Sequence, residues 1–241
     1  MSKQFNADKQ HTLQTAVSIS GTGLHTGQLV DMNLKPAKPG FGIQFQRIDL
    51  PNQPIIKADC DLVVETNRGT TLDSNGARIS TVEHILAAMV GMGVDNVLIE
   101  INGPEIPIID GSAQPFVEII EDAGVVEQDA AKIWYSIGEN IEHIDAEKRV
   151  EMVAMPSVGY QITTLIDFNS PVLGTQHAGL TDIADFKNES IIMTSHPQYD
   201  ENGKPVNNVY FNMFQNESLG TQKYFGMSGL IIEALMHGRP L

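Results

Sequence analysis

Apolar and polar residues alternate along much of the first half of the chain. Alternation at every second position, bounded by glycine, proline and small polar residues, predicts strands. We assign strands on this basis to residues 11–20, 29–37, 42–50 and 96–101. A period of three to four residues predicts a helix that starts near Ser80, with a buried face of Val82, Ile85, Leu86 and Met89. A second helix is predicted over about residues 115–123, ending at Gly124.

The same order of elements begins again in the second half of the chain. The polar residues 127–132 are the best candidate for a linker. Strand patterns then follow in residues 133–144, 149–155 and 160–168. We therefore predict a first domain over residues 1–126 and a second over residues 132–241.

Composition and charge narrow the class of protein. The chain has 241 residues, of which 41% are hydrophobic, enough for a folded core. A formal charge of −15 argues against a non-specific nucleic-acid binder, which needs a basic surface. No stretch has the apolar length of a membrane span, and the N-terminal stretch lacks the apolar core of a signal peptide, so we expect a cytoplasmic protein. Because Cys60 is the sole cysteine, any metal would be held by histidine and carboxylates.

An acid and an imidazole stand side by side at the start of the first predicted helix. In one interpretation, Ser80 and Glu83 form a capping box, and His84 is a partly buried histidine that donates to a backbone carbonyl. In the other, His84 binds zinc, and Glu83 takes the proton of a water that the metal activates. Neighbours on a helix point about 100° apart, so the two side chains can serve two roles. A zinc site of this kind needs two further protein ligands.

Several longer stretches are distinctive: QHTL (10–13), SGTGLHTG (20–27), FQRIDL (45–50), STVEHILAA (80–88), GMGVDNVLIEINGPEIPIIDGSAQPFVE (91–118) and LIDFNSPVLG (165–174). Together they resemble one enzyme family, the zinc-dependent UDP-3-O-acyl-N-acetylglucosamine deacetylases of lipid A synthesis. The resemblance covers roughly residues 9–195. With GTQHAGL at 174–180, the chain looks most like the form fused to a 3-hydroxyacyl-[acyl-carrier-protein] dehydratase.

The resemblance implies an activity and roles for particular residues. In that family the glutamate at Glu83 is the general base, and the histidine at His84 is a ligand of Zn²⁺. Ser195 falls where the family has a threonine near the oxyanion. The implied reaction is hydrolysis of the acetamide of a small UDP-sugar lipid precursor, releasing acetate. His25 and Asp110 match family loops, and for both we favour a structural role, with Asp110 forming a turn.

The C-terminal part departs from the family. The family motif H-K-x-x-D-x-x-G-D, which supplies two zinc ligands, is not found in the sequence. His196 and Asp200 have the i, i+4 spacing that could replace them, but Pro197 restricts them to the first turn of a helix. We regard His143 with Glu147 as a weaker candidate, and for the isolated His177 and His237 we favour a surface position.

The tail itself supports two overlays. Residues 224–241 can be laid over the family's late helix, and residues 227–235 over a dehydratase helix. Glu233 is an acid in both overlays. The polar stretch 196–208 is expected to be a linker or surface loop, and 228–241 a short helix.

Three hypotheses follow: a zinc amidase, an inactive relative or fragment without a complete zinc site, and, most weakly, a remnant of a bifunctional deacetylase/dehydratase. The family implies an α+β fold of two similar units, each a sheet covered by helices, packed helix layer to helix layer. We expect the second unit to be incomplete and family-like only to about residue 195.

Overall fold

A mixed five-stranded sheet forms the centre of the first half of the chain. The computed structural model describes residues 9–66, 69–134, 137–147, 149–167 and 175–189. The sheet has the strand order β2-β3-β9-β4-β5, in which β4 and β9 are parallel and the other pairs are antiparallel. Its strands are β2 (Val17–Thr22), β3 (Leu29–Pro36), β9 (Val97–Ile101), β4 (Ile43–Arg47) and β5 (Ile55–Lys57).

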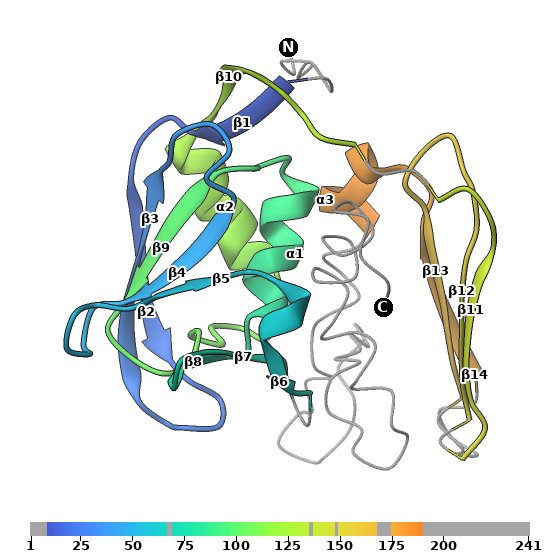
Figure 1. The fold of residues 1–241 in the computed structure, drawn as a ribbon, viewed down its shortest axis with the longest axis horizontal. Helices are drawn as coiled ribbons and strands as arrows, with labels where there is room; N and C mark the ends of the chain where they lie inside the picture. Colours follow the sequence, from blue (N-terminus) through green and yellow to red (C-terminus); the bar gives the residue numbers. More distant parts are fainter. Residues whose placement is uncertain (1–8, 67–68, 135–136, 148, 168–174, 190–241) are drawn as a thin grey trace, which may run out of the picture.

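Two helices cover one face of this sheet: α1 (Glu83–Gly91) and α2 (Gln114–Ala123) (Figure 1). Alternate residues of the central strands turn toward the helices and are buried, as the period-two pattern predicts. The core between sheet and helices includes Met32, Leu34, Phe45, Ile99, Ile85, Met89, Phe116 and Ile120.

Smaller sheets border this layer. One is an antiparallel sheet of three strands, β6 (Val63–Glu65), β7 (Thr71–Ser74) and β8 (Ala77–Ser80). The 3₁₀ turn η1 (Cys60–Leu62) comes before β6, and β8 is followed by α1. β1 (Lys9–Leu13) pairs with β10 (Val125–Ala131). Residues 11–20, predicted as one strand, are therefore divided between β1 and β2, which belong to different sheets.

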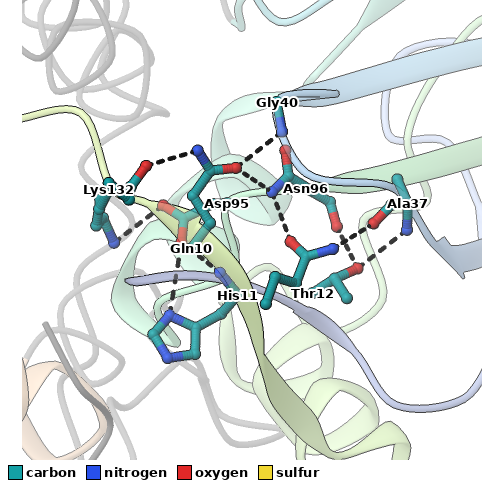
Figure 2. A network of polar contacts seen from close by, with 10 residues as sticks. Gln10, His11, Thr12, Ala37, Gly40, Asp95, Asn96 and Lys132 are labelled. Carbon is teal, nitrogen blue, oxygen red and sulfur yellow. Dashed lines mark hydrogen bonds and ion pairs between the residues drawn. The ribbon is translucent and has the colours of Figure 1, made fainter. Parts of the chain in front are cut away.

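The polar stretch predicted as a linker is a strand. Residues 127–131 lie in β10, and the side chains of Gln128 and Asp129 join a hydrogen-bond network with residues of β1 and with Asn96, just before β9. Figure 2 shows its centre, where Asn96 donates to Gln10 at 2.9 Å and Asp95 pairs with Lys132 at 2.9 Å. Asn96 also donates to Gln128 of β10, at 2.7 Å. This network fixes β10 to the first sheet layer, so the polar residues satisfy buried hydrogen bonds as well as facing solvent.

The described residues of the second half form two antiparallel hairpins. They are β11 (Ile141–Asp145) with β12 (Val150–Ala154), and β13 (Ile162–Asp167) with β14 (Thr175–Leu180). The 3₁₀ turn η2 (Ile183–Asp185) and the short helix α3 (Phe186–Glu189) follow. Phe186 belongs to the hydrophobic core, and its ring lies where a Cβ on Gly91 of α1 would stand. In Figure 1, α3 lies beside α1. Lys187 pairs with Glu121 of α2 at 2.5 Å.

These observations confirm an α+β arrangement of mixed sheets with few helices. The division into two domains and the packing of two helix layers stay predictions. Within the described ranges, no helix has both the length and the apolar character that crossing a membrane requires. The stretches 196–208 and 228–241 lie outside the described residues.

Candidate active site

The turn before α1 has an unusual backbone. Ser80 ends β8, and the next residue, Thr81, is buried with φ +60°. For a β-branched residue this left-handed conformation is strained, at about 1–3 kcal/mol, and persists only where surrounding contacts enforce it. The turn delays the helix, which begins at Glu83 and not near Ser80 as predicted.

The capping-box interpretation of Glu83 is wrong. Val82 occupies the N-cap position, and no side chain caps the helix there. The Ser80 hydroxyl donates to the carbonyl of Pro104 at 3.2 Å. The Glu83 carboxylate accepts the backbone N–H of Thr70, with Oε2 at 2.9 Å. Glu83 is the first helical residue, and its side chain is buried in the protein interior. The side chain of a capping-box glutamate would instead reach back to the backbone of Ser80.

Glu83 is an unusually buried acid, with a side chain only 2% exposed. Burial, opposed by the hydrogen bond from Thr70 and reinforced by the nearby carboxylate of Glu105, raises its pKa to about 7. Its other oxygen lies beside Gly69, where a Cβ would approach Oε1 to 3.3 Å. An acid with these properties can accept and release a proton near neutral pH.

His84 lies beside Glu83 and is 4% exposed, deeper than the partly buried histidine of the alternative interpretation. The adjacent residues leave the helix about 100° apart. The structure therefore holds a buried acid and a buried imidazole in the first turn of one helix.

A second buried carboxylate lies next to this turn. Glu105 is 0% exposed and comes from the segment between β9 and α2. Its Oε1 accepts the backbone N–H of His25 at 2.9 Å and the hydroxyl of Thr81 at 3.1 Å, and Oε2 accepts the N–H of Thr26 at 2.8 Å. Burial raises the pKa of Glu105, but these hydrogen bonds outweigh it and hold the pKa below its usual range.

The two loop residues matched to the family have structural contacts. His25 gives its backbone N–H to Glu105, while its side chain is exposed. Asp110 accepts the backbone N–H and the hydroxyl of Ser112 at 2.9 and 2.8 Å, which confirms the predicted turn.

Among the described residues, no other predicted ligand forms a group of potential metal ligands with His84. Ser195, His196, Asp200, Glu233 and His237 lie outside the described residues. His143 and His177 are exposed on β11 and β14. Within the described ranges, the group of potential metal ligands that lies together is Asp59, Cys60 and Asp61, with ligand atoms within 4.8 Å. It includes neither Glu83 nor His84.

Sequence reasoning missed three residues that shape this site: Thr70, Thr81 and Glu105. For Glu105 a signal was present, because a lone acid interrupts the apolar run of GPEIPII (103–109). Such an acid is buried only when it is hydrogen-bonded. Thr81 gave no signal, since its residue type disfavours the conformation it adopts.

Comparison with known proteins bears on this arrangement. The model of the family described as "LpxC: UDP-3-O-acyl N-acetylglycosamine deacetylase" matches residues 10–194, which include Glu83, His84 and Glu105 but end before Ser195. The chain belongs to this family. The match confirms the resemblance on which the sequence interpretation rests.

Named relatives of the LpxC family support the same assignment. The chain is 44% identical over 181 residues to the "Bifunctional enzyme LpxC/FabZ" of Bacteroides thetaiotaomicron, covering 75% of this chain and 39% of that protein. It is 44% identical over 167 residues to the "UDP-3-O-acyl-N-acetylglucosamine deacetylase" of Myxococcus xanthus, covering 69% and 52%. For the deacetylase of Saccharophagus degradans the values are 42% over 184 residues, covering 76% and 59%. The chain therefore spans between 39% and 59% of the length of these relatives.

Proposed function

We propose that this protein hydrolyses the acetamide of UDP-3-O-acyl-N-acetylglucosamine in lipid A biosynthesis, releasing acetate and a free amine. The observation that carries the proposal is the adjacent, buried pair Glu83 and His84 at the start of α1, inside the segment that matches the LpxC family. The names of the relatives supply the substrate.

Glu83 is proposed as the general base. The N–H of Thr70 holds Oε2 in place, so Oε1 is the oxygen that would accept the proton of the attacking water. The pKa of about 7 lets this carboxyl take a proton and pass it on to the leaving amine near neutral pH. Gly69 matters because it has no side chain to crowd Oε1.

Zn²⁺ is the proposed cofactor, and the described residues fit it in part. His84 is a buried imidazole, a ligand type that zinc prefers, while a catalytic zinc takes three protein ligands. We propose His196 and Asp200 as the other two, from their i, i+4 spacing. When bound, zinc would polarise the acetamide carbonyl and make water more acidic. Ser195 is proposed to donate its hydroxyl to the developing oxyanion.

Further properties are proposed on separate grounds. Family membership suggests two similar units packed helix layer to helix layer. The formal charge of −15 suggests a protein that does not bind nucleic acid, and the sequence pattern suggests a cytoplasmic one. The alternative, an inactive relative, is favoured by one observation, which is that the sequence lacks H-K-x-x-D-x-x-G-D. A remnant of a deacetylase/dehydratase is the weaker alternative.

The test is zinc content by elemental analysis together with acetate release, on the parent and three variants. About one zinc per chain in the parent, lost in His84→Ala and kept in Glu83→Gln, would support the ligand assignment. Acetate release should fall by about 10²–10⁴-fold in Glu83→Gln, as for the loss of a general base. His177→Ala, an exposed histidine on β14, is the matched control and should behave like the parent.

Absence of both zinc and acetate release in the parent would refute the enzyme proposal and leave the inactive relative. If zinc binds, His196→Ala and Asp200→Ala each test one further ligand.

A further inference from the structure

The segment that carries Glu105 lies between two other parts of the site. On one side, its backbone is hydrogen-bonded to the end of β8. The N–H of Ser80 donates to the carbonyl of Pro104 at 2.9 Å, and the N–H of Ile106 donates to the carbonyl of Ser80 at 3.0 Å. On the other side, Ile108 N–H donates to Thr22 at 3.0 Å, at the start of the 23–27 loop. The segment thus joins the turn before α1 to a loop that is distant in sequence.

The Glu105 side chain makes the same connection. It accepts two backbone N–H groups of the loop, from His25 and Thr26, and the hydroxyl of Thr81 from the turn. Hydrogen bonds to a buried charged group are among the stronger ones in proteins. One carboxylate therefore ties the loop to the turn that sets the start of α1.

Two local features fit this connection. A Cβ on Gly23 would collide with Oε2 of Glu105 and approach the Thr26 hydroxyl to 2.5 Å, so glycine is what lets the loop close around the carboxylate. Thr81 has φ +60°, which an isolated β-branched residue avoids. Its hydrogen bond to Glu105 is one contact that can hold it there.

We propose that Glu105 is a positioning residue: by holding the 23–27 loop and the Thr81 turn together, it fixes the first turn of α1 and so the placement of Glu83 and His84. The catalytic part of this inference rests on the proposed function, while the structural link does not. Glu105 is not proposed to touch the reacting atoms.

The test combines hydrogen exchange with kinetics. Exchange is measured on zinc-free protein, in peptides covering residues 23–27 and 81–86, for the parent and Glu105→Gln. The amide of the glutamine would place a donor against the loop N–H groups, so we expect exchange at least tenfold faster in both segments. Glu100→Gln, a strand carboxylate paired with Lys35, is the matched control and should change neither.

Two further variants test whether Glu105 acts through Thr81. Thr81→Val removes the hydroxyl at constant size, and should speed exchange in 81–86 while the loop keeps its protection. Thr81→Ser keeps the hydroxyl and should restore the parent behaviour. The double variant with Glu105→Gln and Thr81→Val should exchange in residues 81–86 no faster than Glu105→Gln alone. The reason is that both substitutions remove the same hydrogen bond.

In acetate release, Glu105→Gln and Thr81→Val should lower kcat at least tenfold, with KM within about threefold and zinc content unchanged. Faster exchange in the loop alone, with parent kcat and parent exchange in 81–86, would overturn the proposal and make Glu105 a simple loop anchor. If Glu105→Gln does not fold, Thr81→Val decides the question. A Thr81→Val protein with the same kcat and the same exchange rates as the parent would also overturn the proposal. A parent without activity refutes the proposed function, and the exchange data still decide the link.

Discussion

Replacing Glu83 with glutamine should stabilise the metal-free protein at pH 8 by more than at pH 5. The folded protein holds the pKa of this carboxyl at about 7, against an ordinary value of 4.5. Between these values the unfolded chain releases the proton while the folded protein retains it. Rising pH therefore favours unfolding, and the penalty is complete above pH 7.

The magnitude follows from the two pKa values. Linkage gives a penalty of about 0.8 kcal/mol at pH 5 and about 3.3 kcal/mol at pH 8, a difference of about 2.5 kcal/mol. Glutamine is neutral at both pH values and has nearly the same shape. Its carbonyl oxygen can still accept the N–H of Thr70, so the substitution removes the charge and keeps the main contact.

The assay is urea unfolding of the parent and Glu83→Gln in the presence of a chelator, at half-unit steps from pH 5 to 8. The other titrating groups are common to both proteins and cancel in the difference. Glu118→Gln, at an exposed position on α2, controls for the exchange of residue type. A difference between parent and Glu83→Gln that does not change with pH would refute the reasoning, because it would mean that the buried carboxyl titrates as in the unfolded chain.

Three other outcomes are expected. Gly91→Ala should destabilise by about 1–3 kcal/mol in urea, because its Cβ would collide with the ring of Phe186, whereas Gly138→Ala, with nothing within 4 Å, should be close to neutral. Asn96→Asp should lower the free energy of unfolding by about 2–3 kcal/mol. An aspartate cannot donate, so the two hydrogen bonds that the Asn96 side chain donates become contacts between oxygens. Unfolding in urea like that of the parent would contradict the network. The lowered pKa of Glu105 contributes stability above about pH 4.5, and this stability is lost as the pH falls through the pKa of the folded protein. In an acid titration followed by circular dichroism, Glu105→Gln should therefore lose less stability than the parent, each compared with its own stability at neutral pH.

The sequence predicted the helix α1 well but not its start. The face of Ile85, Leu86 and Met89 is buried as expected, because burial against the sheet imposes a period on the sequence. Its beginning was misplaced because Ser-Thr-Val-Glu matches a capping box. Thr81 donates a hydrogen bond to Glu105, which lies 24 residues later in the chain, and local preference does not encode such a contact.

The misread linker has a related cause. From Val126 onward the residues of β10 alternate between half-buried and exposed, and the polar Gln128 stands between the half-buried Val126 and Ala130, so the apolar stripe is interrupted. Its partner β1 lies at the other end of this half of the chain. Hydrogen bonds such as that between Gln128 and Asn96 replace apolar burial, and they can be read only once the pairing is known.

Three energetic costs meet around the turn before α1: the positive φ of Thr81, the buried carboxylate of Glu83 and the buried carboxylate of Glu105. Stability alone would be served by glycine at position 81 and by a neutral residue at position 83, since glycine fits the left-handed turn and burial disfavours the charge of Glu83. Strain and buried charge are both concentrated at functional sites, where the surrounding structure maintains them. Here the maintaining contacts are specific, with one acid held by Thr70 and the other by the 23–27 loop and Thr81. The two acids differ in what their environments do. Hydrogen bonds keep Glu105 ionised, while burial keeps Glu83 ready to take a proton, and this division of roles is what a proton-transfer site with a fixed scaffold requires.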